Sequence, residues 1–250
     1  MEKWISYNEL AWTEPIVAPP ELLSDEIELY CRLIRENSLI EPKTLLHLAS
    51  GAGIGDYTFK EHFAVTGVDI SQGMLEVARQ VNPEVTYHYG DMRTVDLGKK
   101  FDAVAIPDSI GYMTTLEDLR KTFHTACNHL KKGGVLLITA HVQEEFKENN
   151  FVYSGKRGDI EVTVFENNYI IDEERTNYEA TIIYLIRHNG ELEIYTDRHI
   201  IGLFSSEIWY GLFKEMALDC KKVALKDLYT PFIMGEGEYP LQIFVCTNVS

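Results

Sequence analysis

Three glycines at alternate positions follow a short apolar run: residues 45–55 read LLHLASGAGIG. Such a segment is typical of a buried strand that turns into a helix, because glycine accepts a positive φ and lets the backbone approach a ligand closely. The amides that open the following helix offer unpaired N–H donors to a carboxylate or a phosphate. The sequence therefore predicts an anionic or zwitterionic ligand at this turn.

The residues after the turn decide between nucleotide-binding classes. A dinucleotide fingerprint requires a third glycine where Asp56 stands, and a negative charge there would repel a pyrophosphate. A phosphate-binding P-loop is excluded because no Gly-Lys-Ser/Thr follows. A nicotinamide-dependent oxidoreductase stays open as a less favoured alternative, since it would also explain a strand, a glycine turn and a distal acid.

Further segments follow in the order and spacing of one known family. They are AVTGVDIS at 64–71, YHYGDM at 87–92, FDAVAIPDS at 101–109 and LKKGGVLLI at 130–138. With the glycine turn, they resemble the class I S-adenosylmethionine-dependent methyltransferases over nearly the full chain. The similarity is closest to small-molecule enzymes with an antiparallel-sheet insertion, including the N,N-dimethyltransferases of nucleotide-linked amino sugars. It implies in-line methyl transfer from S-adenosyl-L-methionine to a small molecule, with nitrogen favoured over oxygen as acceptor.

The same resemblance implies where the cofactor binds. Asp69 ends the second strand, and its two oxygens can accept both ribose hydroxyls. The implied cofactor-binding residues are Tyr7, Ala49, Ser50, Gly51, Ala52, Gly53, Asp69, Ile70, Met74, Asp91, Met92, Ile106 and Pro107. Tyr112 follows the fourth strand and His141 ends the fifth, so both are candidate catalytic residues that take or orient the proton of an amine, as is Asp108.

Two residues of the glycine segment depart from the family pattern. An acid usually stands in place of His47, and a glycine in place of Ala49, which is a mild change if its φ is negative. His47 is interpreted either as a half-buried strand residue bonded to backbone or as a ligand-facing group. A protein that binds S-adenosylmethionine or S-adenosylhomocysteine without turnover therefore stays open as an alternative.

The acceptor is also left open by the sequence. The amino-sugar enzymes carry a late arginine where residues 235–239 read GEGEY, and acidic residues there would oppose a nucleotide diphosphate. They also tend to have a Tyr-Asp step where this chain reads Glu14-Pro15.

Strand and helix patterns alternate through the first half of the chain, which indicates a parallel sheet with right-handed crossovers. The predicted strands are 43–48, 64–69, 85–89, 101–107 and 134–140, and the predicted helices are 21–37, 53–62, 71–81 and 115–130. After a run of strands within 151–201, a helix at 205–217 and strands at 222–225 and 241–247 complete the chain. The predicted fold class is α/β, a Rossmann-like doubly wound, mostly parallel seven-stranded sheet with an inserted antiparallel flap.

Three regions follow from this pattern. Residues 1–42 form an aromatic arm and a helix that cover the site, 43–141 and 202–250 form the cofactor-binding core, and 142–201 form the substrate flap. Within the flap, Asn189-Gly190 predicts a tight hairpin. Strand alternation places Arg198 and His199 on opposite faces, so at most one of them points into the pocket to recognise an anionic substrate group. Arg187 is a further candidate, and the alternative for all three is pairing with Glu191, Glu193 and Asp197.

Composition limits the partners. With 23 basic and 39 acidic residues, the net charge is −16, which argues against nucleic acid and anionic membranes. No run approaches the length of a membrane span, so we expect a cytoplasmic protein whose partner is a small-molecule methyl acceptor; a homodimer stays open. The four cysteines, Cys31, Cys127, Cys220 and Cys246, show no Cys-x-x-Cys pair, and they are expected to be separate buried thiols without a metal.

Overall fold

Two β-sheets make up the protein, and a computed structural model describes them through residues 4–225, 229–235 and 238–249. The larger sheet has seven strands in the order β10-β11-β5-β4-β1-β2-β3. Its strands are β1 (Thr44–Leu48), β2 (Ala64–Asp69), β3 (Thr86–Tyr89), β4 (Phe101–Ile106), β5 (Leu130–His141), β10 (Leu218–Leu225) and β11 (Leu241–Asn248). The strands β1 to β5 pair in parallel, and β11 runs antiparallel to both of its neighbours.

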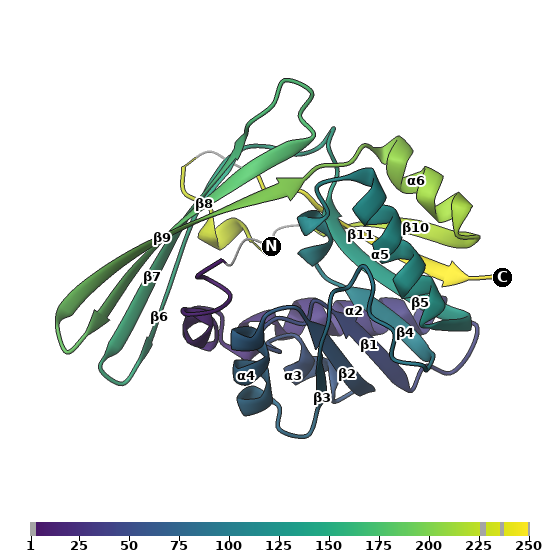
Figure 1. The fold of residues 1–250 in the computed structure, drawn as a ribbon, viewed down its shortest axis with the longest axis horizontal. Helices are drawn as coiled ribbons and strands as arrows, with labels where there is room; N and C mark the ends of the chain where they lie inside the picture. Colours follow the sequence, from purple (N-terminus) through teal and green to yellow (C-terminus); the bar gives the residue numbers. More distant parts are fainter. Residues whose placement is uncertain (1–3, 226–228, 236–237, 250) are drawn as a thin grey trace.

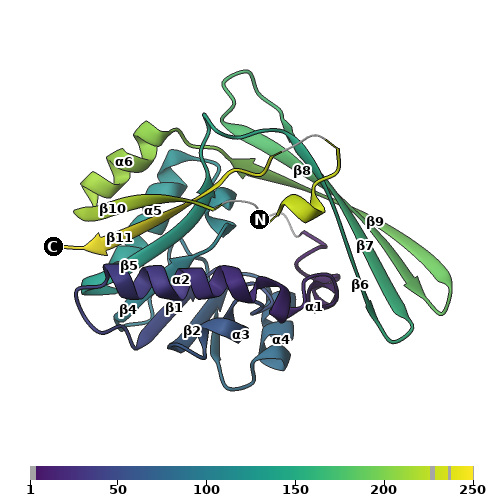
Figure 2. The same cartoon turned by 180° about the vertical axis from the view of Figure 1, so that it is seen from behind.

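Helices cover both faces of this sheet. They are α2 (Ser24–Asn37), α3 (Asp56–Phe59), α4 (Gln72–Val81), α5 (Leu116–Asn128) and α6 (Ser206–Glu215), whereas α1 (Glu14–Val17) packs against the smaller sheet. Helices α5 and α6 lie on one face, and α2, α3 and α4 lie on the other (Figures 1 and 2). Their apolar side chains pack against the sheet. The continuous apolar runs of β1 and β4 are therefore buried from both sides, as parallel strands require. No helix in the described ranges is long and apolar enough to cross a membrane.

The smaller sheet is antiparallel and projects from the core beside the N-terminal segment (Figure 1). Its strands, in order, are β6 (Asn149–Arg157), β7 (Ile160–Ile170), β8 (Asn177–His188) and β9 (Glu191–Gly202). Asn189 and Gly190 join β8 to β9 with φ values of 51° and 87°, so both residues of this two-residue turn are left-handed. The predicted hairpin and the predicted fold class are both confirmed.

Several element boundaries differ from the prediction, two of them near the site. The helix expected at 53–62 contains only Asp56–Phe59, because Gly51 and Gly53 take φ values of 55° and 72° and keep the preceding turn out of helical geometry. Strand β5 begins at Leu130, and its ladder with β4 changes register between Phe101 and Ala103. Gly133, which the prediction placed before this strand, therefore lies within it.

One cysteine expectation is wrong. Cys220 and Cys246 lie opposite each other on β10 and β11 and form a disulfide, whereas Cys31 and Cys127 are free. The two partners are 26 residues apart in the chain. Only the antiparallel register of the last two strands brings them together, so Cys spacing could not reveal the pair.

Candidate active site

The carboxylate of Asp69 is fixed at the end of β2 by two backbone amides. Gly51 N–H donates to Oδ2 at 2.8 Å, and Ser71 N–H donates to Oδ1 at 2.8 Å. Burial raises the pKa of Asp69, and these two hydrogen bonds oppose that rise. Because a carboxylate oxygen has two lone pairs, each oxygen keeps one acceptor site. The Gly51 amide is therefore engaged by Asp69.

A cavity of about 410 Å³ lies beside this carboxylate. Eleven of the predicted cofactor-binding residues line it: Tyr7, Ala49, Ser50, Gly51, Ala52, Asp69, Ile70, Met74, Asp91, Met92 and Pro107. The Ser50 hydroxyl is buried beside Gly67 of β2 and has no hydrogen-bond partner in the described structure. The cavity thus combines an acidic group with an apolar wall.

Two predicted cofactor-binding residues do not line this cavity. Ile106 is fully buried in the core of the sheet. Gly53 packs against the side chains behind the turn, where an added Cβ would lie 2.6 Å from Tyr87 Oη and 2.8 Å from Asn82 Nδ2. Its glycine identity therefore serves packing and the positive φ of the turn.

His47 and Asp56 form a buried pair that supports the glycine turn. His47 Nδ1 lies 2.7 Å from Asp56 Oδ1, and Tyr87 Oη donates to Asp56 Oδ2 at 2.9 Å. Asn82 Nδ2 donates both to Tyr87 Oη at 3.1 Å and to the carbonyl oxygen of Gly53 at 2.7 Å. His47 also lines the cavity, and its hydrogen-bond partner is the Asp56 carboxylate rather than backbone. Asp56 itself is fully buried behind the turn.

Ala49 adopts a conformation that favours glycine. Its φ is 55°, so the condition under which this substitution would be mild is not met. A left-handed conformation costs a residue with a Cβ roughly 1–2 kcal/mol. The turn therefore carries backbone strain at the position where the family pattern has glycine.

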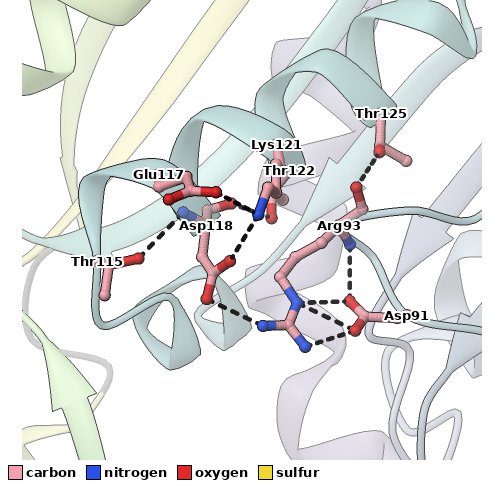
Figure 3. Close-up of polar contacts among 8 residues, drawn as sticks. All are labelled: Asp91, Arg93, Thr115, Glu117, Asp118, Lys121, Thr122 and Thr125. Carbon is pink, nitrogen blue, oxygen red and sulfur yellow. Dashed lines mark hydrogen bonds and ion pairs between the residues drawn. The ribbon is translucent and has the colours of Figure 1, made fainter.

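The carboxylate of Asp91 is already engaged by an arginine (Figure 3). Arg93 Nη2 lies 2.6 Å from Asp91 Oδ2, and Arg93 Nη1 lies 2.9 Å from Asp118 Oδ2 on α5. Burial raises the pKa of Asp91, but the hydrogen bonds from Arg93 outweigh it and lower the pKa overall. Asp91 thus remains at the cavity wall as part of an ion-pair network that ties the loop after β3 to α5.

A second cavity, of about 320 Å³, lies under the antiparallel sheet. It shares Tyr7, Glu14, Leu23, Asp108, Ser109, Tyr112 and Tyr229 with the first cavity. Its wall contains seven tyrosines: Tyr7, Tyr112, Tyr153, Tyr178, Tyr184, Tyr229 and Tyr239. The core, the N-terminal arm and the sheet all contribute to it, so the two cavities meet where these three parts join.

Tyr112 belongs to a chain of hydrogen bonds at this junction. Its hydroxyl is bonded to the hydroxyl of Tyr7 and lies 2.8 Å from His199 Nδ1. His199 Nε2 in turn lies 3.1 Å from Asp197 Oδ2, and the ring of Trp4 packs at 4.9 Å from that of Tyr112. Burial raises the pKa of Tyr112 and of Tyr7 well above the usual range, so both phenols stay neutral.

Three carboxylates from different elements line the second cavity. Burial raises the pKa of Glu14, of Glu166 and of Asp108, the last to about 7, and the charge of Glu166 adds to the rise at the other two. Sequence reasoning missed Glu14 and Glu166 as pocket residues. A signal existed for Glu166, since it shares the inward parity of Val162 and Val164 on β7.

His141 does not line either cavity, contrary to its catalytic prediction. Its Nδ1 lies 3.2 Å from the carbonyl oxygen of Pro240, and its ring packs edge-on behind Tyr178 and Tyr239. Burial lowers its pKa to about 4. The strand end carries His141 toward the site, but the tyrosines of the cavity wall lie in front of it.

The basic residues of the flap separate as strand alternation predicted. His199 is buried and lines the cavity, whereas Arg198 is exposed and pairs with Glu179. Arg187 is exposed as well and donates to the carbonyl oxygen of Gly190 at the hairpin turn, 3.3 Å away. The expected partners of the arginines were therefore wrong, while the pairing of His199 with Asp197 is confirmed.

Comparison with known proteins accounts for this arrangement. A family profile described as "Methyltransferase domain" matches residues 45–134. The dTDP-4-amino-2,3,4,6-tetradeoxy-D-glucose N,N-dimethyltransferase of Saccharopolyspora spinosa is 30% identical over 182 residues, which cover 72% of this chain and 73% of that enzyme. The chain belongs to the S-adenosylmethionine-dependent methyltransferases. The resemblance on which the predicted cofactor rested is thereby confirmed, and the oxidoreductase alternative is set aside.

Other similar proteins support the same placement of this methyltransferase. The dTDP-3-amino-3,4,6-trideoxy-alpha-D-glucopyranose N,N-dimethyltransferase of Streptomyces venezuelae is 39% identical over 100 residues, 39% of this chain and 42% of that enzyme. The crystal structure of Streptomyces venezuelae DesVI matches with a TM-score of 0.77 at 24% identity, covering 92% of this chain and 93% of that one. S-adenosylmethionine-bound CalS10, an amino pentose methyltransferase from Micromonospora echinaspora, matches with a TM-score of 0.72 at 22% identity, covering 90% and 91%. These structures share its fold.

Proposed function

We propose that this methyltransferase acts on a nitrogen of a small molecule bound in the 320 Å³ cavity under the antiparallel sheet. The observation that carries the proposal is the shared wall of the two cavities, where Tyr7, Asp108 and Tyr112 face both. A cofactor in one cavity and an acceptor in the other would meet at these residues. The similar dimethyltransferases are named for amino-sugar substrates, which supports nitrogen as the acceptor atom.

The residues of the 410 Å³ cavity fit S-adenosylmethionine. The free lone pairs of Asp69 suit the two ribose hydroxyls. Ile70 and Met92 offer an apolar surface for a base. When bound, this cofactor supplies a methyl group on a positively charged sulfur, and its transfer to a neutral amine releases S-adenosylhomocysteine and requires one proton to leave the nitrogen.

We assign the proton handling to Asp108 and the orientation of the amine to Tyr112. Asp197 holds His199 Nε2, so His199 Nδ1 accepts the hydroxyl proton of Tyr112. The Tyr112 oxygen then has one lone pair for Tyr7 and one for an N–H of the acceptor. Since the pKa of Asp108 is raised to about 7, its carboxylate is basic enough to accept a proton near neutral pH.

Two measurements test this function in sequence. Calorimetric titration with S-adenosylmethionine and S-adenosylhomocysteine should give dissociation constants in the micromolar range. Incubation with S-adenosylmethionine and a mixture of primary amines should then yield S-adenosylhomocysteine and N-methylated product, detected by mass spectrometry. Binding without transfer to any amine would favour a non-catalytic binding protein, and absence of binding would refute the cofactor site.

The remaining assignments are proposals that the same protein preparation can test. We propose that residues 1–42 cover the site, that 43–141 and 202–250 bind the cofactor, and that 142–201 act as the substrate flap. The net charge of −16 supports a partner other than nucleic acid. Cytoplasmic residence and a homodimer stay predictions, to be checked by cell fractionation and by light scattering.

A further inference from the structure

The charged side chains that line the 320 Å³ cavity are acidic. Glu14 of α1, Asp108 after β4 and Glu166 of β7 line it, and none of the described lining residues is lysine or arginine. His199 is the single imidazole among those residues, and it is already bonded to Tyr112 and Asp197. The cavity therefore offers carboxylates without a resident cation.

Two of these carboxylates have no partner in the described structure. Neither Glu14 nor Asp108 makes a side-chain hydrogen bond or ion pair there; Glu14 is half-buried, and Asp108 is exposed at the cavity wall. Glu166 is half-buried too and accepts hydrogen bonds only from neutral donors, Asn168 Nδ2 at 2.9 Å and Tyr153 Oη at 3.4 Å. Carboxylates that line one cavity repel one another, and a cation between them relieves that repulsion. A bound cation would supply what the protein itself does not.

The tyrosine wall suits the same kind of ligand. An ammonium group is attracted to the face of an aromatic ring, and this attraction is stronger where water is excluded. Tyr153, Tyr178 and Tyr184 lie on the sheet, and Tyr229 and Tyr239 lie on the segment before β11. Their rings give apolar contact along an aliphatic chain and π-faces for its charged ends.

A phosphate group would meet the opposite surroundings. Proteins bind phosphate with arginine, lysine or clustered backbone amides, and Glu14 and Glu166 would repel it. The flap arginines are engaged elsewhere: Arg198 pairs with Glu179, and Arg187 lies at the hairpin turn. Arg157 and Arg175 donate to the carbonyl oxygens of Pro15 and Phe146. Glu238, in the segment where the amino-sugar enzymes carry an arginine, pairs with Lys147 at 2.5 Å.

We propose that the acceptor of this methyltransferase is a small aliphatic diamine or polyamine without a phosphate group. This inference rests on the proposed function and replaces the nucleotide-linked sugar with a cationic acceptor. One nitrogen loses its proton to Asp108 and receives the methyl group at the junction with the cofactor cavity. The second, which stays an ammonium ion, pairs with Glu166 deeper under the sheet.

The test is calorimetric binding to the intact protein saturated with S-adenosylhomocysteine, in about 150 mM salt to screen exposed charge. The probes are 1,4-diaminobutane, n-butylamine and thymidine diphosphate. We expect 1,4-diaminobutane to bind at least tenfold more tightly than n-butylamine, because only the diamine has a second charge for Glu166. Thymidine diphosphate should not bind.

Two variants on β7 distinguish an effect of the cavity carboxylate on diamine affinity from an effect of the protein's overall negative charge. Glu166→Gln should weaken 1,4-diaminobutane at least tenfold and leave n-butylamine unchanged. Glu161→Gln removes an equal charge from an exposed position of β7 and should leave both affinities unchanged. S-adenosylhomocysteine binding by each variant reports that the fold is intact.

The outcomes distinguish this inference from the function on which it rests. Micromolar binding of thymidine diphosphate, equal affinities for diamine and monoamine, or equal effects of the two variants would overturn the diamine assignment while the methyltransferase function stands. No binding of S-adenosylhomocysteine by the unaltered protein would refute the proposed function itself.

Discussion

The assignment of Asp69 to the cofactor ribose predicts a specific loss of affinity in Asp69→Asn. Each oxygen of Asp69 already accepts one amide and keeps one lone pair. Asparagine is neutral and retains a single oxygen, so one ribose hydroxyl loses its acceptor and the other keeps an uncharged one. A hydrogen bond to a charged group contributes about 1.5–3 kcal/mol. At 1.4 kcal/mol per tenfold change, the dissociation constant for S-adenosylhomocysteine should rise about 10- to 140-fold.

The assay is calorimetric titration of the unaltered protein, Asp69→Asn and a charge-matched control. Asp219→Asn removes the same charge from an exposed position of β10 and should bind as the unaltered protein does. A 2′,3′-dideoxy analogue of S-adenosylhomocysteine should bind the unaltered protein and Asp69→Asn within about threefold of each other, since it lacks both hydroxyls. A change below twofold for S-adenosylhomocysteine itself in a folded Asp69→Asn would show that this carboxylate does not hold the ribose.

Three further predictions concern catalysis, the turn and pH. Tyr112→Phe should lower the single-turnover rate of methyl transfer about tenfold or more with cofactor affinity unchanged, because it loses only the hydroxyl that orients the amine; an equal single-turnover rate would remove Tyr112 from the mechanism. Gly53→Ala should lower the melting temperature by roughly 6–12 °C, since about 3 kcal/mol of strain and overlap is introduced, whereas Gly98→Ala, at φ 62° with no atom within 4 Å of an added Cβ, should cost about 1 kcal/mol. Equal shifts would contradict the role of Tyr87 packing. The raised pKa of Asp108, about 7, means that the folded protein binds this proton more tightly than the unfolded chain, so the associated stability is present at low pH and is lost as the pH rises through 7. Asp108→Asn should therefore gain melting temperature relative to the unaltered protein between pH 5 and pH 8, and a constant difference would refute the shift.

The fold and the cofactor cavity could be predicted because their signals are local. The strand ending at Asp69 and the turn beginning at Ser50 are each encoded by consecutive residues, and the order of a doubly wound sheet brings their ends together. Parity within a strand also correctly predicted that Arg198 and His199 lie on opposite faces. These inferences need only the chain's local pattern and the rules of sheet topology.

The contacts that set the chemistry of the site depend on distant segments. In the sequence, His47 departs from the methyltransferase pattern and Asp56 from the dinucleotide fingerprint, with nothing to connect them. In the structure they are bonded to each other, and Tyr87 and Asn82 extend the network behind the turn. No local pattern states which side chains meet across a sheet.

The acidic lining of the second cavity could not be predicted either, because its carboxylates are far apart in the sequence. Glu14, Asp108 and Glu166 belong to three regions of the chain, and only the packing of arm, core and sheet encloses them together. For His141, the end of its strand was predicted correctly, but the sequence does not show that Tyr178 and Tyr239 lie between it and the cavity.

The N-terminal arm is fastened at both sides of the site. Ser71, at the start of α4, donates its hydroxyl to the carbonyl oxygen of Tyr7, and Asp197 of β9 accepts the amide of Ser6 at 2.9 Å. At Gly155 of β6 the arm passes so close that a Cβ would meet the carbonyl oxygen of Ile16. Exchange of either ligand is therefore expected to wait for the arm to detach, which would make release of S-adenosylhomocysteine, rather than methyl transfer, the step that sets the turnover rate.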